Sequence, residues 1–220
     1  MSVNVQNFEA VNREVAAAGA RLVAVTKQRS LADIHTLYDL GQRDFGENRA
    51  AELAEKAEQL PRDIRWHFIG HLQRNKAREV APYVTLLHAG DSLRLLRELD
   101  KRAAALDRTF DVLLQFHVAR EESKYGLDGA GGRELCRKLT EEPLHHLRLT
   151  GVMGMATNTD EEAIVDAEFR RLNDYFTALK AEFYADDPAF RELSMGMSGD
   201  YRTALRRGST LVRVGSLLFA

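Results

Sequence analysis

The sequence Arg21-Leu22-Val23-Ala24-Val25-Thr26-Lys27 decides the fold, because it is a short apolar run that ends in a charged residue. Its β-branched and small apolar residues are typical of a buried strand, and a helical pattern follows directly after Lys27. This stretch alone leaves two explanations for the lysine open. It is either the solvated end of a strand, or an amine in an apolar mouth, where loss of hydration favours the neutral nucleophile that forms Schiff bases.

The rest of the chain repeats this alternation of a short apolar run and a helical stretch. After an opening helix at about 4–18, the predicted strands are 21–26, 43–46, 65–69, 84–88, 111–116, 147–152, 191–195 and 211–214. Helices are predicted after the first seven strands, near 30–40, 49–59, 72–80, 92–106, 130–141, 160–182 and 200–207, and 216–219 could begin a short terminal helix. Eight such units predict an α/β fold, a (β/α)8 TIM barrel with an extra N-terminal helix.

The main competitor is an open doubly wound sheet. When that fold binds a dinucleotide, it needs a glycine-rich turn after its first strand. The corresponding turn, Thr26-Lys27-Gln28-Arg29-Ser30, contains no glycine. The sequence therefore favours the barrel, and we expect a single domain over residues 1–220.

Composition excludes several functional classes. Lys and Arg total 31 against 33 Asp and Glu, so no basic field suggests nucleic acid. Residues 1–20 do not resemble a signal peptide, and no stretch approaches the ~18 apolar residues of a membrane span. The single cysteine, Cys136, excludes an intrachain disulfide and is expected in the core. We expect a cytoplasmic protein and, for an isolated barrel, a monomer.

The chemistry of such barrels lies at the carboxyl ends of the strands, and a phosphate is often held by the loops after strands seven and eight. The sequence 194–200 combines small residues, hydroxyls and a helix start there, and Gly215-Ser216 follows strand eight. Ser198 and backbone amides could bind an anion. Ordinary capping and turn formation is the alternative for either segment alone, but the two together favour a phosphate site.

Other polar residues near strand ends are less decisive. Arg213 stands between two valines in strand eight, so it is expected to point inward, either to a carboxylate or to a ligand ring nitrogen. His71, His88 and His117 come from different strands and show no metal-binding spacing. Glu47, and the pair Glu121-Glu122 near Lys124, are candidates for acid–base work.

Seven motifs carry a resemblance that covers nearly the whole chain. They are VAVTK (23–27), FGEN (45–48), WHFIGHLQRNK (66–76), KYGL (124–127), LTGVM (149–153), LSMGMS (193–198) and VRVGS (212–216). On these motifs the chain resembles the pyridoxal phosphate homeostasis protein family, the YggS type. It departs from the family's pattern at 115–120 and at Ser216, where threonine is common. The resemblance implies a fold-type III barrel like the N-terminal domain of alanine racemase, with pyridoxal 5′-phosphate (PLP) as its cofactor.

The resemblance also implies roles for individual residues. It assigns a Schiff base with PLP to Lys27, the pyridine nitrogen to Arg213, and a place beside the cofactor to Asn48. It assigns the phosphate to Ser198, Gly215 and Ser216. Lys124 matches a lysine connected with cofactor handling, which is the weakest of these assignments.

Three functions remain open at this point. An arginine at the ring nitrogen keeps that nitrogen unprotonated and makes the ring a poorer electron sink. The chain ends at Ala220, directly after the last strand, so we expect no second domain of the alanine racemase type. These points favour a PLP homeostasis protein without turnover of its own, which passes PLP to apo PLP-dependent enzymes. The alternatives are a racemase-like PLP enzyme and a barrel enzyme that forms a sugar Schiff base on Lys27.

Overall fold

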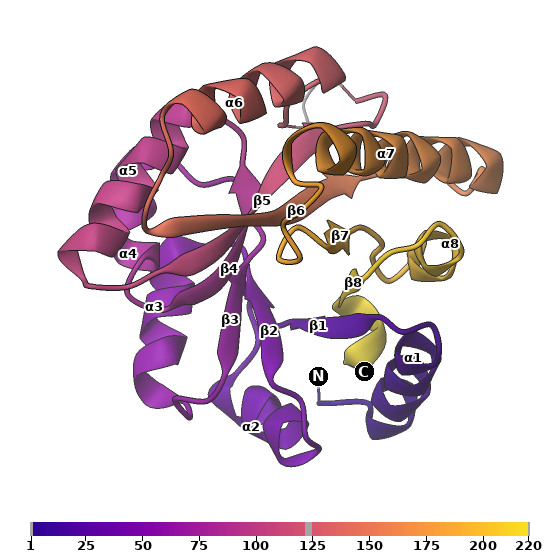
Figure 1. Ribbon diagram of the computed structural model, residues 1–220. Helices are drawn as coiled ribbons and strands as arrows, with labels where there is room; N and C mark the ends of the chain where they lie inside the picture. The colour runs from indigo at the N-terminus through magenta and orange to yellow at the C-terminus, as the bar shows by residue number, and fades with distance from the viewer. Residues whose placement is uncertain (1, 122–124, 220) are drawn as a thin grey trace.

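Eight parallel strands close into a barrel in the computed structural model, which describes residues 2–121 and 125–219 (Figure 1). The strands are β1 (Arg21–Val25), β2 (Asp44–Glu47), β3 (Arg65–Phe68), β4 (Val84–Gly90), β5 (Phe110–His117), β6 (Leu147–Met155), β7 (Glu192–Ser194) and β8 (Leu211–Val214). They pair in chain order, and β8 pairs with β1 in the register Val23↔Arg213. The predicted (β/α)8 barrel is confirmed.

Helices surround this barrel. They are α1 (Val5–Ala17), α2 (Leu31–Asp39), α3 (Ala50–Gln59), α4 (Ala77–Val80), α5 (Leu93–Ala105), α6 (Gly129–Glu141), α7 (Glu162–Phe183) and α8 (Tyr201–Arg206), with 3-10 turns η1 (Arg74–Lys76) and η2 (Ser216–Leu218). The helix predicted at 72–80 is wrong in detail. The chain instead forms η1 and then the single turn of α4: Leu72, Ala77 and Val80 meet the core, whereas Arg74 and Lys76 between them stay in solvent.

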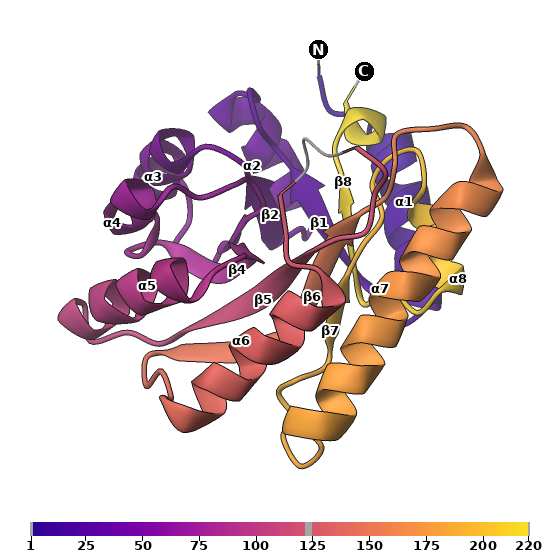
Figure 2. The same cartoon turned by 90° about the horizontal axis from the view of Figure 1, so that it is seen from above.

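The two ends of the chain lie together at the end of the barrel where the strands finish (Figure 2). The Asn4 side chain caps α1 by accepting a hydrogen bond from the Asn7 amide. The Asn4 amide in turn donates to Leu218 O at 2.8 Å, and Asn7 Nδ2 donates to Leu217 O at 3.1 Å. The predicted N-terminal helix therefore packs against the segment that follows β8.

Alternation along the strands divides their side chains between two environments. One set packs outward against the helices and forms the large core, in which Trp66 is buried and Cys136 is buried as predicted. The inward set has a small apolar layer made of Val23, Leu86, Leu113, Met153 and Leu211. This layer is too small to fill the barrel, so the rest of the interior is polar.

The core also explains the state of the cysteine, since burial raises the pKa of the Cys136 thiol to about 11. Over residues 2–121 and 125–219, no helix has the length and apolar character needed to span a membrane. Within the same residues, no three His, Cys, Asp or Glu side chains gather as metal ligands would.

Candidate functional site: a cavity at the carboxyl ends of the strands

A cavity of about 540 Å³ opens where the strands end. Its lining comes from the ends of β1, β2, β3, β5 and β6 and from the loops after β7 and β8. It contains all six residues for which the sequence predicted cofactor binding, namely Lys27, Asn48, Ser198, Arg213, Gly215 and Ser216. The barrel thus brings together groups that lie up to 189 positions apart between Lys27 and Ser216.

Lys27 follows β1 and continues the inward face begun by Val23 and Val25, because side chains alternate along a strand. Its side chain reaches the cavity wall, but the residue is exposed, so the mouth does not enclose it as an apolar pocket would. Within the part of the chain that the structure describes, no hydrogen bond or ion pair involves Lys27 Nζ. The amine is therefore held near the cavity by its backbone and is open to reaction.

A buried ion cluster behind β1 fixes that backbone. Lys56 Nζ, from α3, donates to Thr26 O and to Glu47 Oε1, each at 2.7 Å. It also donates to Glu52, and the same Glu52 oxygen accepts from the Gln28 amide at 2.5 Å. Both neighbours of Lys27 in the chain are thus tied to one cluster, which restricts the direction in which the Lys27 side chain leaves the strand.

Glu47 is part of this cluster and does not line the cavity, which argues against the acid–base role considered for it. The residue is completely buried, and burial raises the pKa of its carboxyl although the hydrogen bonds from Lys56 and Thr26 lower it. Sequence reasoning missed Lys56. Its one local signal is a lysine three positions after Leu53, on the helix face that carries the buried residues.

The loops after β7 and β8 meet through a hydroxyl. Ser198 Oγ accepts a hydrogen bond from the Gly215 amide at 3.2 Å, and the Met197 amide donates to Asp200 Oδ1 at 2.5 Å. Gly196 makes the turn possible, since its φ of 95° is in the left-handed region and a Cβ there would lie 2.6 Å from Ala204 Cβ. The hydroxyls of Ser198 and Ser216 consequently reach one wall of the cavity.

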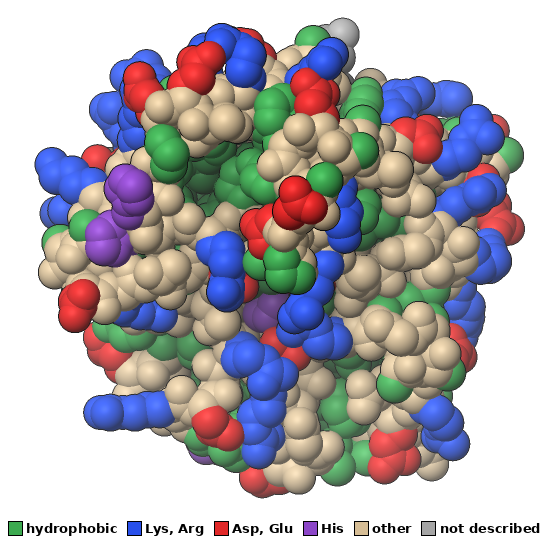
Figure 3. All heavy atoms as spheres, in the orientation of Figure 1, with side chains coloured by type: hydrophobic (Ala, Val, Ile, Leu, Met, Phe, Trp, Pro, Cys, Tyr) green, Lys and Arg blue, Asp and Glu red, His purple; other side chains and the backbone are tan. Residues whose placement is uncertain are grey.

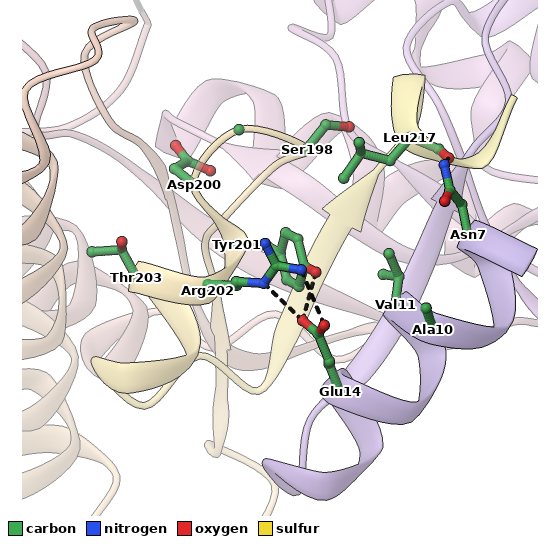
Figure 4. Close-up of a pocket in the computed structure, with 11 residues that line it drawn as sticks. Asn7, Ala10, Val11, Glu14, Ser198, Asp200, Tyr201, Arg202, Thr203 and Leu217 are labelled. Atoms are coloured by element: carbon green, nitrogen blue, oxygen red, sulfur yellow. Dashed lines mark hydrogen bonds and ion pairs between the residues drawn. The ribbon is translucent and has the colours of Figure 1, made fainter. Parts of the chain in front are cut away.

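A second, smaller pocket of about 240 Å³ lies behind these loops, between α1 and α8 (Figure 4). Glu14 accepts hydrogen bonds from Arg202, at 2.9 and 3.0 Å, and from Tyr201 Oη, at 2.7 Å. These hydrogen bonds, that from Arg202 above all, lower the pKa of Glu14 to about 2. The contacts join α1 to α8 and support the Ser198 loop from outside the barrel.

Arg213 points into the barrel, as the alternation predicted, and is 3% exposed. Its Nη1 donates to Ser194 Oγ at 2.5 Å and its Nη2 donates to Gly154 O at 3.1 Å. Neither of these hydrogen-bond partners is a carboxylate, although the negative charge of Asp200 acts on the guanidinium. Burial lowers the pKa of Arg213 to about 10, which still leaves the guanidinium charged at neutral pH. Within residues 2–121 and 125–219, Arg213 is therefore a cation on the cavity wall with no carboxylate hydrogen-bonded to it.

Three further polar or aromatic-ring side chains line the cavity, and sequence reasoning did not assign them to it. Gln115 is buried on β5, where its Nε2 donates to Tyr125 O at 3.1 Å and its Oε1 has no partner. The rings of His71 and Tyr125 stack at 3.8 Å, and His71 Nδ1 lies 3.4 Å from Asp91 Oδ2. Alternation along strand five could have placed Gln115 inward, whereas the stacked pair depends on contacts between distant loops.

The remaining candidates do not join this group. His88 lies deep in the barrel, and His117 Nε2 lies 2.8 Å from Glu121 O, away from the other histidines. The Glu121 carboxylate accepts from the Asn158 amide at 3.1 Å. Glu122 and Lys124 lie outside the described residues, so the structure has no bearing on their predicted roles.

The lining can be compared with the chemistry of PLP, which joins an aldehyde, a basic ring nitrogen and a phosphate. The cavity offers the amine of Lys27, the guanidinium of Arg213 and the hydroxyls of Ser198 and Ser216. The buried Gln115 Oε1 is an acceptor that lacks a donor within the described structure. The volume of about 540 Å³ also falls in the usual range of about 300–1,000 Å³ for small-molecule sites. These residues fit the cofactor.

The fold and the cavity define a barrel of the alanine racemase N-terminal type. The family model described as "Alanine racemase, N-terminal domain" matches residues 5–220. The alanine racemase of Clostridium difficile is 14% identical, with a TM-score of 0.71 over 99% of this chain and 57% of that one. At this identity the likeness concerns the fold alone.

More similar proteins narrow the family. A pyridoxal phosphate homeostasis protein of Synechocystis sp. is 39% identical over 202 residues, which are 90% of this chain and 90% of that protein. PipY of Synechococcus elongatus, whose structure is described as having PLP bound, is 32% identical, with a TM-score of 0.87 over 98% of this chain and 99% of that one. This chain belongs to the pyridoxal phosphate homeostasis protein family.

Proposed function

We propose that this chain binds PLP in the cavity, attached covalently to Lys27 Nζ, and takes part in PLP homeostasis in the cytoplasm. It would store, protect or deliver the cofactor, with apo PLP-dependent enzymes as transient recipients, and turn over no substrate of its own. The whole of residues 1–220 forms one domain in this proposal, which acts as a monomer.

One observation carries the proposal. Lys27 is an amine that has no partner among the described residues, and it lies on the wall of a cavity that also contains Arg213 and two hydroxyl-bearing loops. Lys56, by contrast, is buried, and its ammonium group donates hydrogen bonds to Glu47, Glu52 and Thr26 O. The difference supports Lys27 as the reactive lysine, and the PLP-bound structure of PipY supports the choice of cofactor.

The absence of turnover is supported by the cation beside the cavity. Bound PLP supplies an electrophilic carbon and an electron sink, and its ring withdraws electrons best when the ring nitrogen carries a proton. The positive charge of Arg213 opposes a second positive charge at that nitrogen. Arg213 is therefore suited to binding the cofactor and poorly suited to promoting carbanion chemistry.

A racemase-like PLP enzyme is the second candidate. His71 and Tyr125 favour it, because they stack at the cavity and are the side chains that could serve as a second base beside Lys27. Incubating the loaded protein with each of the proteinogenic amino acids, followed by chiral chromatography, separates the two functions. We expect turnover no faster than with free PLP, and Lys27-dependent racemisation above that level would establish the enzyme instead.

The covalent attachment is tested by borohydride reduction and peptide mapping. Purified protein loaded with PLP should show an absorbance band that borohydride bleaches. Trypsin cannot cleave after a modified lysine, so we expect a pyridoxyl adduct on the uncleaved peptide 22–29. Lys76→Ala is the matched control, since Lys76 pairs with Glu79 on the surface and should leave the adduct in place. A colourless protein that takes up no PLP would refute the proposal.

A further inference from the structure

A line of hydrogen-bonded side chains crosses the barrel interior beneath the cavity. From Arg213 Nη1 the contacts run to Ser194 Oγ at 2.5 Å and from there to His88 Nδ1 at 3.0 Å. His88 Nε2 lies 2.9 Å from His67 Nδ1, and His67 Nε2 lies 2.9 Å from Asp44 Oδ1. All five residues are buried, and they come from β8, β7, β4, β3 and β2.

The two ends of this line restrict the directions of the hydrogen bonds between them. A guanidinium can only donate and a carboxylate can only accept. If Ser194 accepts from Arg213, its own hydroxyl hydrogen is left to donate to His88 Nδ1. His88 then donates from Nε2 to His67 Nδ1, and His67 donates from Nε2 to Asp44. This proton assignment agrees with both ends, satisfies each group along the line and leaves both imidazoles neutral.

The opposite assignment satisfies fewer groups. A doubly protonated His67 would donate to both Asp44 and His88, and His88 would then donate from Nδ1 to Ser194. The Ser194 hydroxyl hydrogen would have no acceptor among the contacts of the described residues, which is costly for a group that is 0% exposed. Burial also lowers the pKa of His88 well below its ordinary value, which agrees with a neutral ring there.

The far end of the line is held by ion pairs where the strands begin. Arg65 donates to both carboxylate oxygens of Asp44, at 2.8 and 2.7 Å, and Arg21 lies 4.0 Å from Asp44 and 2.8 Å from Glu192. Figure 3 views the barrel from this end and shows basic and acidic side chains close together over its centre. Asp44 is therefore a fixed anchor.

We propose that Ser194, His88, His67 and Asp44 are positioning residues for Arg213, forming a one-way chain of hydrogen bonds that holds its guanidinium against the cavity. The carboxylate of this line, Asp44, is four hydrogen bonds away from Arg213, so the line orients the guanidinium without placing a carboxylate in contact with it. A carboxylate in the place of Ser194 would orient Arg213 equally well but would cancel its charge. The claim that Arg213 contacts PLP rests on the proposed function, whereas the chain of hydrogen bonds does not depend on it.

The direction of the chain is tested on the full protein freed of PLP. In 15N-histidine-labelled protein, long-range 1H–15N spectra distinguish the two neutral tautomers from the doubly protonated ring. We expect both His67 and His88 to be neutral and protonated at Nε2 near pH 7. A doubly protonated His67, or a hydrogen on His88 Nδ1, would overturn the one-way chain, whether or not the protein binds PLP.

The positioning role is tested with a matched pair of substitutions at His88. In His88→Gln the amide can accept from Ser194 and donate to His67, whereas His88→Leu has a similar volume and no polar atoms. We expect His88→Leu to shift the Arg213 Nε–H resonance of the PLP-free protein, to shift the absorbance band of the loaded protein, and to weaken PLP binding roughly tenfold, the cost of one buried unsatisfied group. His88→Gln should bind PLP within about threefold of the wild type.

Other results are equally decisive. Equal effects of the two variants, or an unmoved Arg213 resonance in a folded His88→Leu, would reduce His88 to a packing role and overturn the proposal. Should His88→Leu fail to fold, Ser194→Ala removes one hydroxyl in its place and should give the same shifts. A wild-type protein that binds no PLP would refute the proposed function. The resonances of the PLP-free protein would still show whether the hydrogen bonds from Arg213 to Asp44 all run in one direction.

Discussion

The two ends of the barrel interior differ in whether their charged side chains are paired. Where the strands begin, Arg65 and Asp44 pair, and Arg21 pairs with Glu192. Where the strands end, Lys27 and Arg213 line the cavity and form no ion pair among the described residues. Paired charges are already satisfied by the protein, whereas unpaired cations are left to be satisfied by an anionic ligand. Within the barrel interior, the difference indicates that the beginnings of the strands contribute stability and that the cavity binds, while the Lys56–Glu47 pair stabilises the cavity end from behind β1.

The largest effect is expected at Lys27. Lys27→Ala should abolish covalent attachment completely, because no other described amine lines the cavity. Some noncovalent binding should remain, since Ser198, Ser216 and Arg213 are untouched. Borohydride reduction followed by mass spectrometry measures the first quantity, and equilibrium dialysis measures the second. Retention of the adduct at another lysine, or a folded variant with no residual binding, would break the assignment of the two roles to separate residues.

The next largest effect is expected at the opposite end, on stability. Asp44 accepts two hydrogen bonds from Arg65 and one from His67. Removing one partner of a buried ion pair typically costs about 3–5 kcal/mol, so Asp44→Ala should lower the free energy of unfolding by about that amount. Urea denaturation followed by circular dichroism provides the measurement. A loss below about 1 kcal/mol would show that this end is not the stabilising one.

The ionisation of Asp44 should also make the free energy of unfolding depend on pH in the acid range. Burial raises the pKa of its carboxyl, but the hydrogen bonds from Arg65 and His67 outweigh burial and hold the pKa well below its usual range. A lowered pKa in the folded state means that this contribution to stability is complete above the unfolded value of about 3.9 and is lost as the pH falls below it. The same denaturation series from pH 6 to pH 3 should show a smaller decrease in Asp44→Ala than in the wild type.

A moderate effect is expected when the cation at the cavity is reversed. Arg213→Glu replaces the cation with a carboxylate, which favours protonation of the PLP ring nitrogen. The absorbance band of the loaded protein should therefore shift. Loss of the cation and its bonds to Ser194 and Gly154 O should also weaken PLP binding, by roughly tenfold or more. An unchanged spectrum and affinity in a folded variant would remove Arg213 from the site and erase the contrast between the two ends.

The same contrast explains what could be predicted from the sequence. Strand number and order could be predicted because each buried parallel strand is a short apolar run of its own. The strand ends differ from the prediction: β4 continues to Gly90 and β6 to Met155, because pairing with β5 extends these strands and no local signal marks their ends. The six predicted cofactor residues all line one cavity because strand ends converge in any barrel.

The residues that support the site could not be predicted in this way. Lys56 acts through contacts between α3 and the turn after β1, and His67 meets His88 only once β3 and β4 pair. Of these two histidines, only His88 was considered from the sequence, together with His71 and His117 from other strands. Their donor and acceptor directions depend on Arg213 and Asp44, which closure of the barrel brings to opposite ends of the same line.

The smallest effect is expected at an exposed ion pair near the beginnings of the strands. Arg148 and Asp111 also pair near the beginnings of their strands, at 2.7 Å, but the Arg148 side chain is 59% exposed. Exposed pairs are typically worth about 0.2–1 kcal/mol because water and salt screen them. Asp111→Asn should therefore change the free energy of unfolding by less than about 1 kcal/mol, and by still less at high salt. A loss as large as that of Asp44→Ala would mean that the number of ion pairs at this end, rather than their burial, determines its stability.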